Sequence, residues 1–340
     1  MNFFSKKTAR WGFLLLLIAG TVYAIRTNRN IPFQRNEGMI FGTTYHITYQ
    51  WDSDLHADIR NEMEKVNASL SPFNPRSIIS AVNRNEDVLP DSMFTEVFEL
   101  AGRISENTDG AFDITIAPLV NAWGFGFENN DRITPNQIDS LLAFVGHRKV
   151  SMENGRIVKR DPRTILDCSA IAKGYGCDVV ARMLDRRGVR NYMVEIGGEI
   201  VLHGQNPRRK AWQIGINQPV EDSLNISGKL ETILNATDIA MATSGNYRNF
   251  YYKDGRKFAH TIDPHTGYPV QHSLLSSTVL APECAVADAY ATAFMVMGLD
   301  SAKQIAERHP ELMVYFIYAD EQGNNRSYYS PELKKMIQKN

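Results

Sequence analysis

Hydrophobic residues recur at helical spacing in five segments of the chain. Residues 56–70 repeat apolar positions three or four residues apart, which predicts an amphipathic helix with one buried face. Residues 134–146 begin with a capping box formed by Thr134 and Gln137, and they carry Pro135 at the first helical position. The predicted helices span residues 56–70, 91–110, 134–146, 170–188 and 285–298.

Segments with alternating or β-branched apolar residues lie between these helices and predict strands. We expect the first strand in residues 39–51, where the folded part of the chain begins. Residues 191–204 predict a strand that contains Gly197 and Gly198, where a bulge or a close backbone approach is expected. The remaining strands are predicted in residues 149–160 (a pair), 211–219, 239–245, 256–264, 274–282 and 313–330 (a hairpin).

The order of these elements lacks the regular βαβ alternation of a doubly wound sheet, which favours an α+β fold. The chain has no internal repeat, low-complexity tract or internal linker, so residues 39–340 are expected to form a single mixed α/β domain. Residues 26–38 are polar and predict a linker in front of that domain.

The N-terminus carries Lys6, Lys7 and Arg10 in front of an apolar run, residues 11–25. A helix of this length spans only about 22 Å, whereas the hydrocarbon core of a bilayer is about 30 Å thick. The length is typical of a signal peptide, but the sequence around residues 22–26 is a poor cleavage site. We therefore expect residues 1–25 to be a signal peptide or an uncleaved membrane anchor, of which the poor cleavage site favours the anchor, and the rest of the chain to be exported.

The composition is ordinary for a globular protein, with 43% hydrophobic and 22% charged residues. Because 37 Lys and Arg nearly balance 38 Asp and Glu, no general attraction to nucleic acid is expected. Cys168, Cys177 and Cys284 form no CxxC pair, which argues against a zinc site or a disulfide framework. They are expected to be small buried residues.

Asp288 and Thr292 lie four residues apart in the last predicted helix, so their oxygens face the same side. A carboxylate and a hydroxyl are hard-oxygen donors that suit Mg²⁺. On spacing alone, an alternative remains open, in which Asp288 neutralises the helix N-terminus and Thr292 packs among alanines.

Residues 167–178, "DCSAIAKGYGCD", mark a transition from strand to helix, where free N–H groups attract anions. Lys173 would add a positive charge. Gly174 and Gly176 begin a dinucleotide fingerprint, but Val179 stands in place of its third glycine, so the Rossmann signal is weak. A phosphate site and a structural helix start are both open at this stage.

Residues 258–270, "FAHTIDPHTGYPV", predict a tight turn after a strand, which holds His260 on rigid backbone. Histidine is well suited to take a proton from an alcohol near neutral pH. A hydrogen-bonded strand histidine is the alternative. Residues 110–126, "GAFDITIAPLVNAWGFG", predict either a binding wall or ordinary core.

Taken together, five motifs resemble one family, the FAD:protein FMN transferases of the ApbE type. The similarity runs from residue 41 to residue 298 with order and spacing kept. The motifs are "FGT", "SPFNPRSIISAVN", "GAFDITIAPLVNAWGFG", "DCSAIAKGYGCDVVA" with "NYMVEIGGEI", and "ATSGNYRNF" with "HTIDPHTGYPV" and "ADAYATA". The resemblance implies a catalytic domain of the ApbE (T-fold-like) type over residues 39–340.

The resemblance implies a magnesium-dependent transfer of the FMN half of FAD to a threonine hydroxyl of an acceptor protein, with release of AMP. It places FAD on Phe41, Phe73, Ala111, Phe112, Asp113, Asp167, Lys173 and the backbone near Ile262. It places Mg²⁺ on the backbone oxygen of Ala170 and on Asp288 and Thr292. His260 matches the base that activates the threonine.

The chain departs from the family pattern at three of the matching positions. Phe41 replaces the methionine of a Met-Gly-Thr motif, and Phe73 replaces an aromatic residue that carries a hydroxyl. Ala291 stands where some members have a second aspartate, so weaker metal binding is expected. No N-terminal cysteine is present for attachment to lipid.

The resemblance points to an acceptor in a membrane electron-transfer complex, such as the sodium-pumping NADH:quinone oxidoreductase (Nqr) or its Rnf-type relatives. It implies an exported enzyme, anchored in the inner membrane and facing the periplasm. A Mg²⁺-dependent FAD pyrophosphatase that yields FMN and AMP would use the same residues, and a non-catalytic flavin carrier is a further alternative. Thr115 ends a loose match to the acceptor pattern, but Phe112 and Asp113 break it, so self-labelling is not expected.

Overall fold

A large antiparallel sheet forms the centre of the protein. The computed structural model describes residues 6–27, 31–125, 133–219, 230–246, 250–253, 256–259 and 261–338. Its strands are β1 (Phe33–Ile40), β2 (Thr43–Gln50), β3 (Val150–Glu153), β4 (Arg156–Lys159), β5 (Tyr192–Ile196), β6 (Glu199–His203), β7 (Trp212–Asn217), β8 (Leu230–Ala236), β9 (Ile239–Gly245), β10 (Phe250–Lys253), β11 (Arg256–Ala259), β12 (Leu274–Ala281), β13 (Met313–Ala319) and β14 (Asn325–Tyr329). Eight of them form one sheet in the order β1-β2-β5-β6-β9-β12-β13-β14, with antiparallel neighbours throughout. The α+β prediction is confirmed.

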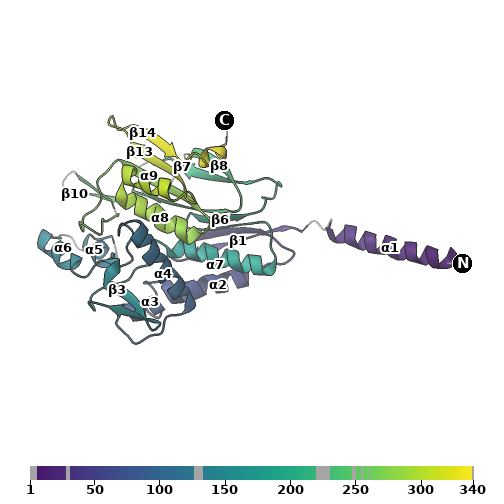
Figure 1. Cartoon of the computed structure of the whole chain (residues 1–340), viewed down its shortest axis with the longest axis horizontal. Helices are drawn as coiled ribbons and strands as arrows, with labels where there is room; N and C mark the ends of the chain where they lie inside the picture. The colour runs from purple at the N-terminus through teal and green to yellow at the C-terminus, as the bar shows by residue number, and fades with distance from the viewer. Residues whose placement is uncertain are drawn as a thin grey trace.

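Helices cover one face of this sheet. The helices of the described residues are α1 (Lys6–Thr27), α2 (His56–Leu70), α3 (Ile78–Asn83), α4 (Ser92–Asn107), α5 (Ala117–Ala122), α6 (Pro135–Leu142), α7 (Ala172–Arg187), α8 (Cys284–Met297) and α9 (Leu299–Arg308), with the 3₁₀ turns η1 (His147–Lys149) and η2 (Leu333–Lys335). Helices α7 and α8 lie side by side against the central strands, and α2, α4 and α9 pack around them (Figure 1).

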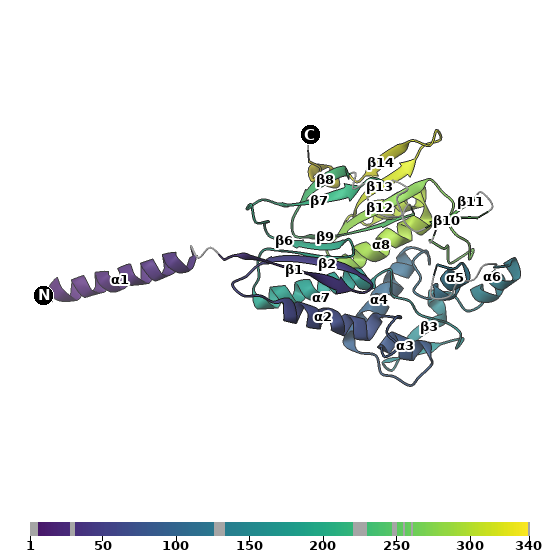
Figure 2. The ribbon, with the colours of Figure 1, turned by 180° about the vertical axis from the view of Figure 1, so that it is seen from behind.

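The hairpin of β7 and β8 covers the opposite face of the sheet, as seen from behind in Figure 2. Because neighbouring strand residues point to opposite faces, Met241 of β9 packs with Ile214 of this hairpin while Ala242 packs with the helices. The central strands are thus buried on both sides. Apolar residues therefore dominate them, as in Leu274–Ala281, which buries seven of its eight positions.

The predicted helices are confirmed, and their capping residues act as expected. Asp91 accepts a 2.8 Å hydrogen bond from the backbone N–H of Phe94 at the start of α4. Thr134 and Gln137 form both bonds of the capping box of α6. Helices α4 and α6 end at Asn107 and Leu142, a few residues before the glycines that were predicted to follow them.

The predicted first strand and the linker in front of it require correction. Residues 39–51 contain a hairpin turn at Phe41 and Gly42, whose φ angles of 52° and 74° suit a two-residue connection. Residues 33–38, predicted as linker, belong to β1. This strand lies at the edge of the sheet and Asn36 is its one buried residue, so it lacks the hydrophobic alternation that marks a strand in sequence.

The segment 191–204 is also a hairpin and not one interrupted strand. Gly197 and Gly198 have φ angles of 66° and 105° and connect β5 to β6. Positive φ angles favour glycine, so the turn of this hairpin accounts for the glycine pair. The bulge that the sequence suggested is not needed to explain it. Five described helices and strands had no sequence prediction, namely β8, β10, α3, α5 and α9.

Helices α7 and α8 meet backbone to backbone at Gly174. A Cβ at this position would lie 2.7 Å from the carbonyl carbon of Cys284 and 2.9 Å from the Cα of Ala285. Only glycine leaves room for this approach, so the first turns of the two helices are held directly against each other.

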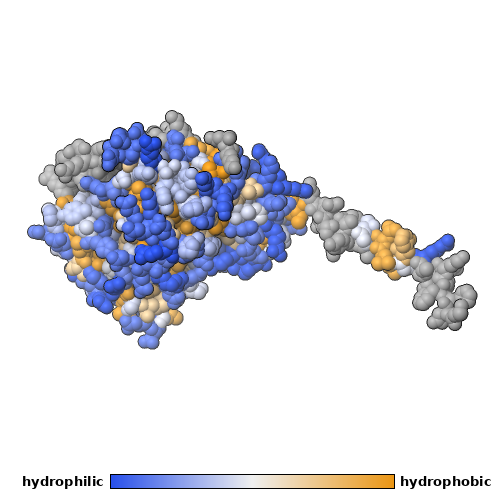
Figure 3. Space-filling model, turned by 45° about the horizontal axis from the view of Figure 1, so that its top comes forward, coloured by the Kyte–Doolittle hydropathy of each residue, from blue (hydrophilic) through white to orange (hydrophobic). Residues whose placement is uncertain are grey.

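The described part of α1 exposes a band of large apolar side chains (Figure 3). Trp11 is 67% exposed and Leu16 is 74% exposed, so α1 is not part of the hydrophobic core. Among the described residues, we find no helix whose length and apolar content would suffice to cross a bilayer.

Candidate active site

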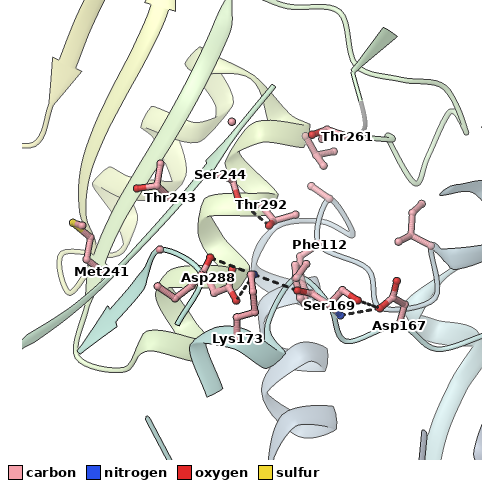
Figure 4. A pocket seen from close by; sticks show the side chains of 18 of the residues that line it. Phe112, Asp167, Ser169, Lys173, Met241, Thr243, Ser244, Thr261, Asp288 and Thr292 are labelled. Carbon is pink, nitrogen blue, oxygen red and sulfur yellow. Dashed lines mark hydrogen bonds and ion pairs between the residues drawn. The ribbon is translucent and has the colours of Figure 1, made fainter. Parts of the chain in front are cut away.

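A cavity of about 640 Å³ lies beside the first turns of α7 and α8. Segments far apart in the chain converge on it, and Figure 4 shows several of their side chains pointing toward one another. The lining comes from residues within 111–120, 167–173, 195–200, 215–217, 241–245 and 261–264 and from positions 288, 292 and 296 of α8.

The charges around this cavity are strongly unequal. Lys173 is the one basic side chain among the described residues that line it. The carboxylates on the same lining are Asp113, Asp167, Glu195, Glu199 and Asp288. An anionic ligand would therefore require added positive charge.

Lys173 bridges two buried carboxylates that come from different elements. Its ammonium lies 3.2 Å from an oxygen of Glu199, at the start of β6, and 3.5 Å from Oδ2 of Asp288, on α8. Asp288 Oδ2 also accepts a 3.0 Å hydrogen bond from the backbone N–H of Gly174. The close approach of α7 to α8 thus brings the lysine and the aspartate together (Figure 4).

The pKa values of this cluster reflect burial and charge in competition. Burial alone would lower the pKa of Lys173, but the carboxylates of Asp288 and Glu199 outweigh it and raise the pKa. Burial raises the pKa of Glu199, and the nearby Lys173 opposes this shift. The ammonium of Lys173 therefore stays charged at neutral pH.

The predicted donors for Mg²⁺ lie on the same cavity. Asp288 and Thr292 are one helical turn apart on α8, and Ala170 lies on the facing loop. The hydroxyl of Thr292 is 3.1 Å from that of Ser244 on β9 (Figure 4). A carboxylate, a hydroxyl and a backbone carbonyl are hard donors, so the residues present fit the ion.

Within the described residues, no three His, Cys, Asp or Glu side chains gather as ligands for one metal ion. The donor set expected here contains a single carboxylate, and the remaining donors are a threonine hydroxyl and a main-chain oxygen. The magnesium site stays a prediction.

The loop before α7 is ordered by Asp167. Its Oδ1 accepts hydrogen bonds from the backbone N–H and the hydroxyl of Ser169, at 2.8 and 2.5 Å. The carbonyl of Ser169 in turn lies 3.5 Å from the ammonium of Lys173. From the sequence, this helix start could either bind phosphate or have a purely structural role. In the structure it lines the cavity.

The predicted flavin segment Ala111–Asp113 lines the cavity on another side. The oxygens of Asp113 accept bonds from the N–H and hydroxyl of Thr115 and from the backbone N–H of His147. Burial raises the pKa of Asp113, and these hydrogen bonds oppose the shift. Both oxygens of this carboxylate thus accept hydrogen bonds within the protein.

Thr115 is fully buried, and its hydroxyl donates to Asp113 and accepts from the N–H of Gly146, both at 2.7 Å. A hydroxyl held in this way is not available to attack a substrate. The structure therefore agrees with the expectation that the chain does not label itself at Thr115.

Two other predicted residues, Phe41 and Phe73, are not among those that line this cavity. Phe41 packs in the turn between β1 and β2, where a Cβ on Gly176 would be 2.7 Å from its ring. Phe73 is 72% exposed outside the cavity lining. His260 lies outside the described residues, whereas the following Thr261 and Ile262 line the cavity. The roles of Phe41, Phe73 and His260 stay predictions.

The comparisons with known proteins identify the family. The sequence model of the ApbE family matches residues 41–316. The chain belongs to the ApbE family. A curated relative from Haemophilus influenzae, named FAD:protein FMN transferase, is 38% identical over 303 residues, which cover 84% of this chain and 86% of the relative. A relative of the same name from Vibrio cholerae is 36% identical over 89% of this chain and 92% of its own length.

Solved ApbE structures confirm the fold. The flavin transferase ApbE from Vibrio cholerae superposes with a TM-score of 0.81 at 35% identity and covers 90% of this chain and 99% of that one. The apo form of the flavinyl transferase ApbE from Pseudomonas stutzeri gives 0.80 at 28% identity, over 90% and 97% of the two chains. The sequence-based identification of an ApbE-type transferase is confirmed.

Sequence reasoning missed Glu199 as part of the ApbE site. It is a charged residue that directly follows Gly197 and Gly198 and precedes the apolar run Ile200–Leu202. A charged residue at the start of an apolar strand requires a partner if it is buried, and this was the signal available in the sequence. In the structure Glu199 is 4% exposed. Ser244 was also missed, because nothing in its sequence neighbourhood indicates that it faces Thr292.

Proposed function

We propose that this ApbE-family chain transfers the FMN moiety of FAD to a threonine hydroxyl of an acceptor protein and releases AMP. The observation that carries the proposal is the convergence of Lys173, Asp288 and Thr292 on one cavity in a chain of this family. The curated relatives named FAD:protein FMN transferase support the same reaction class.

The reaction replaces the phosphoanhydride bond between the FMN and AMP halves of FAD by a phosphoester bond to the threonine. The threonine oxygen forms a bond to the phosphorus of the FMN phosphate, while the bond from that phosphorus to the bridging pyrophosphate oxygen breaks. AMP leaves with the bridging oxygen, and the threonine proton passes to the imidazole of His260. A positioned base of this kind typically contributes about 10²- to 10⁴-fold.

Lys173 supplies positive charge next to the pyrophosphate in this proposal. Because one lysine faces five carboxylates on the described lining, it cannot by itself balance a pyrophosphate. Ala170, Asp288 and Thr292 would hold Mg²⁺, and the chemistry that the bound ion supplies is neutralisation of phosphate charge. The hydrogen bond from Gly174 to Asp288 keeps this carboxylate oriented toward the site.

An acceptor-labelling assay tests the proposal. The protein is incubated with FAD and a threonine-bearing acceptor, with Mg²⁺ or with EDTA, and the acceptor is examined for flavin fluorescence in a denaturing gel. We expect a fluorescent acceptor and free AMP only with Mg²⁺. Release of FMN and AMP without labelling would instead identify an FAD pyrophosphatase, and binding of FAD without turnover would identify a carrier.

We further propose that residues 1–25 anchor the enzyme in the inner membrane with the catalytic domain in the periplasm. The cationic and apolar pattern of the N-terminus supports this location. The acceptor would then be a subunit of a membrane electron-transfer complex of Nqr or Rnf type. Fractionation of cells that express the full chain, with protease added to spheroplasts, tests the location, because a domain on the outer face would be digested.

A further inference from the structure

Glu199 has an unusual environment for a carboxylate. It is the first residue of β6 and is 4% exposed on the wall of the cavity. One of its oxygens pairs with Lys173 at 3.2 Å, whereas the other, Oε2, is buried without a hydrogen-bond partner. A buried oxygen left unpaired is costly, so its retention calls for a reason.

Asp288 and Glu199 differ in what else they bind. Asp288 accepts a hydrogen bond from the N–H of Gly174 in addition to its contact with Lys173. Glu199 has Lys173 as its one side-chain partner within the described residues. Lys173 is therefore shared by the two carboxylates, and Asp288 keeps the N–H of Gly174 as a donor when the lysine leaves.

The proposed reaction makes competing demands on this cluster. A divalent cation on Asp288 would repel the ammonium of Lys173, which now lies 3.5 Å from that carboxylate. Lys173 would then require a different anchor if it is to remain beside the phosphates. Glu199 is already the nearer carboxylate, and its unpaired oxygen can accept a second N–H of the same ammonium.

We propose that Glu199 is a positioning residue that holds the ammonium of Lys173 at the pyrophosphate of FAD when Asp288 is engaged by the cation. The inference rests on the proposed function and extends it to a residue outside the predicted site. Glu199 would not contact the reacting atoms. It acts through Lys173.

The test measures the affinity for FAD, by quenching of flavin fluorescence, with Mg²⁺ and with EDTA. In Glu199→Gln we expect about tenfold weaker binding with Mg²⁺ and less than twofold weaker binding with EDTA, where Asp288 still holds Lys173. Glu199→Asp keeps the charge and should recover most of the loss. Equal weakening in the two conditions would overturn the proposal, because it would indicate a purely structural role.

A double-mutant cycle with Lys173→Met tests whether the effect passes through the lysine. The double variant should bind FAD no more weakly than Lys173→Met alone. Losses that multiply would overturn the proposal. Glu195→Gln is the matched control, since Glu195 lines the same cavity from the same hairpin but pairs with His46 at 2.6 Å; it should not show the dependence on Mg²⁺.

These measurements use binding and not transfer. If the wild-type protein binds FAD but labels no acceptor, the proposed function fails while the coupling of Glu199 to Lys173 can still be read. If labelling succeeds and the coupling is absent, the inference about Glu199 alone fails.

Discussion

The carboxylate of Asp178 on α7 accepts a 2.8 Å hydrogen bond from the backbone N–H of Cys284 at the start of α8. Its other oxygen accepts an equally short bond from the N–H of Ala285. One helix therefore caps the N-terminus of its neighbour, and the capped helix carries Asp288 and Thr292. The start of α8 has no cap from its own N-terminal residue, Glu283.

Removal of this cap should destabilise the protein. We expect Asp178→Ala to lower the free energy of unfolding by about 2–4 kcal/mol, because two buried hydrogen bonds to one carboxylate are lost. Urea unfolding followed by circular dichroism measures the change. A loss below about 0.5 kcal/mol, the range of ordinary surface substitutions, would contradict the role assigned to this residue.

The same residue predicts a dependence of stability on pH. Burial outweighs the two backbone N–H donors and raises the pKa of Asp178 to about 7, from an ordinary value of 3.8. Between these values the folded state binds a proton that the unfolded state does not, so this contribution to stability is full below about pH 4 and is lost as pH rises toward 7. In Asp178→Asn this component should be absent, and unfolding of both proteins at pH 5 and pH 8 compares them.

Gly174→Ala should destabilise the protein, because the new methyl group would meet the main chain of Cys284 and Ala285. Overpacking of this kind costs about 1–3 kcal/mol, and more where backbone must move. Gly102→Ala is the matched control, since Gly102 is also helical and a Cβ there would meet nothing within 4 Å. It should stabilise α4 by up to about 1 kcal/mol, and opposite signs in the two variants are the expected result.

Asp288→Ala should reduce flavin transfer by at least about 100-fold, because the single carboxylate of the proposed magnesium site is removed. Asp139→Asn alters an exposed carboxylate on α6 and should retain full activity. Labelling rates over a range of Mg²⁺ concentrations provide the measurement. Equal rates for the two variants would exclude Asp288 from the site.

His260→Ala should lower the transfer rate by about 10²- to 10⁴-fold and leave affinity for FAD within about twofold. This prediction rests on the sequence motif, since His260 lies outside the described residues. Single-turnover labelling with saturating FAD separates the chemical step from binding. A weaker affinity with an unchanged rate would assign His260 to binding of FAD.

Helices with regularly spaced apolar residues, and the glycine at which a helix ends, could be predicted from the sequence. Ile59, Met63, Val66 and Leu70 are buried as their spacing requires, and Gly188 ends α7 in the left-handed conformation expected of a C-terminal glycine. Cys168, Cys177 and Cys284 are buried free thiols, as expected for small buried residues.

The missed features depend on tertiary partners. Strand β1 is polar because it lies at the sheet edge, and only its pairing with β2 makes it a strand. The roles of Asp288 and Thr292 could be suggested because both lie on one helix. Glu199 and Lys173 are 26 positions apart in the sequence. The residues next to each of them do not indicate that their side chains meet at 3.2 Å in the fold.

Because the main chains are in direct contact at Gly174, the first turns of α7 and α8 should move together as one rigid body. Lys173 and Asp288 are each within a turn or so of this contact, so a displacement of one helix carries the other with it. Substitutions in distant parts of the core should therefore lower the population of folded molecules without altering the spacing of the ammonium and the carboxylate. The catalytic rate per folded molecule should remain almost constant across such variants as long as the glycine is kept.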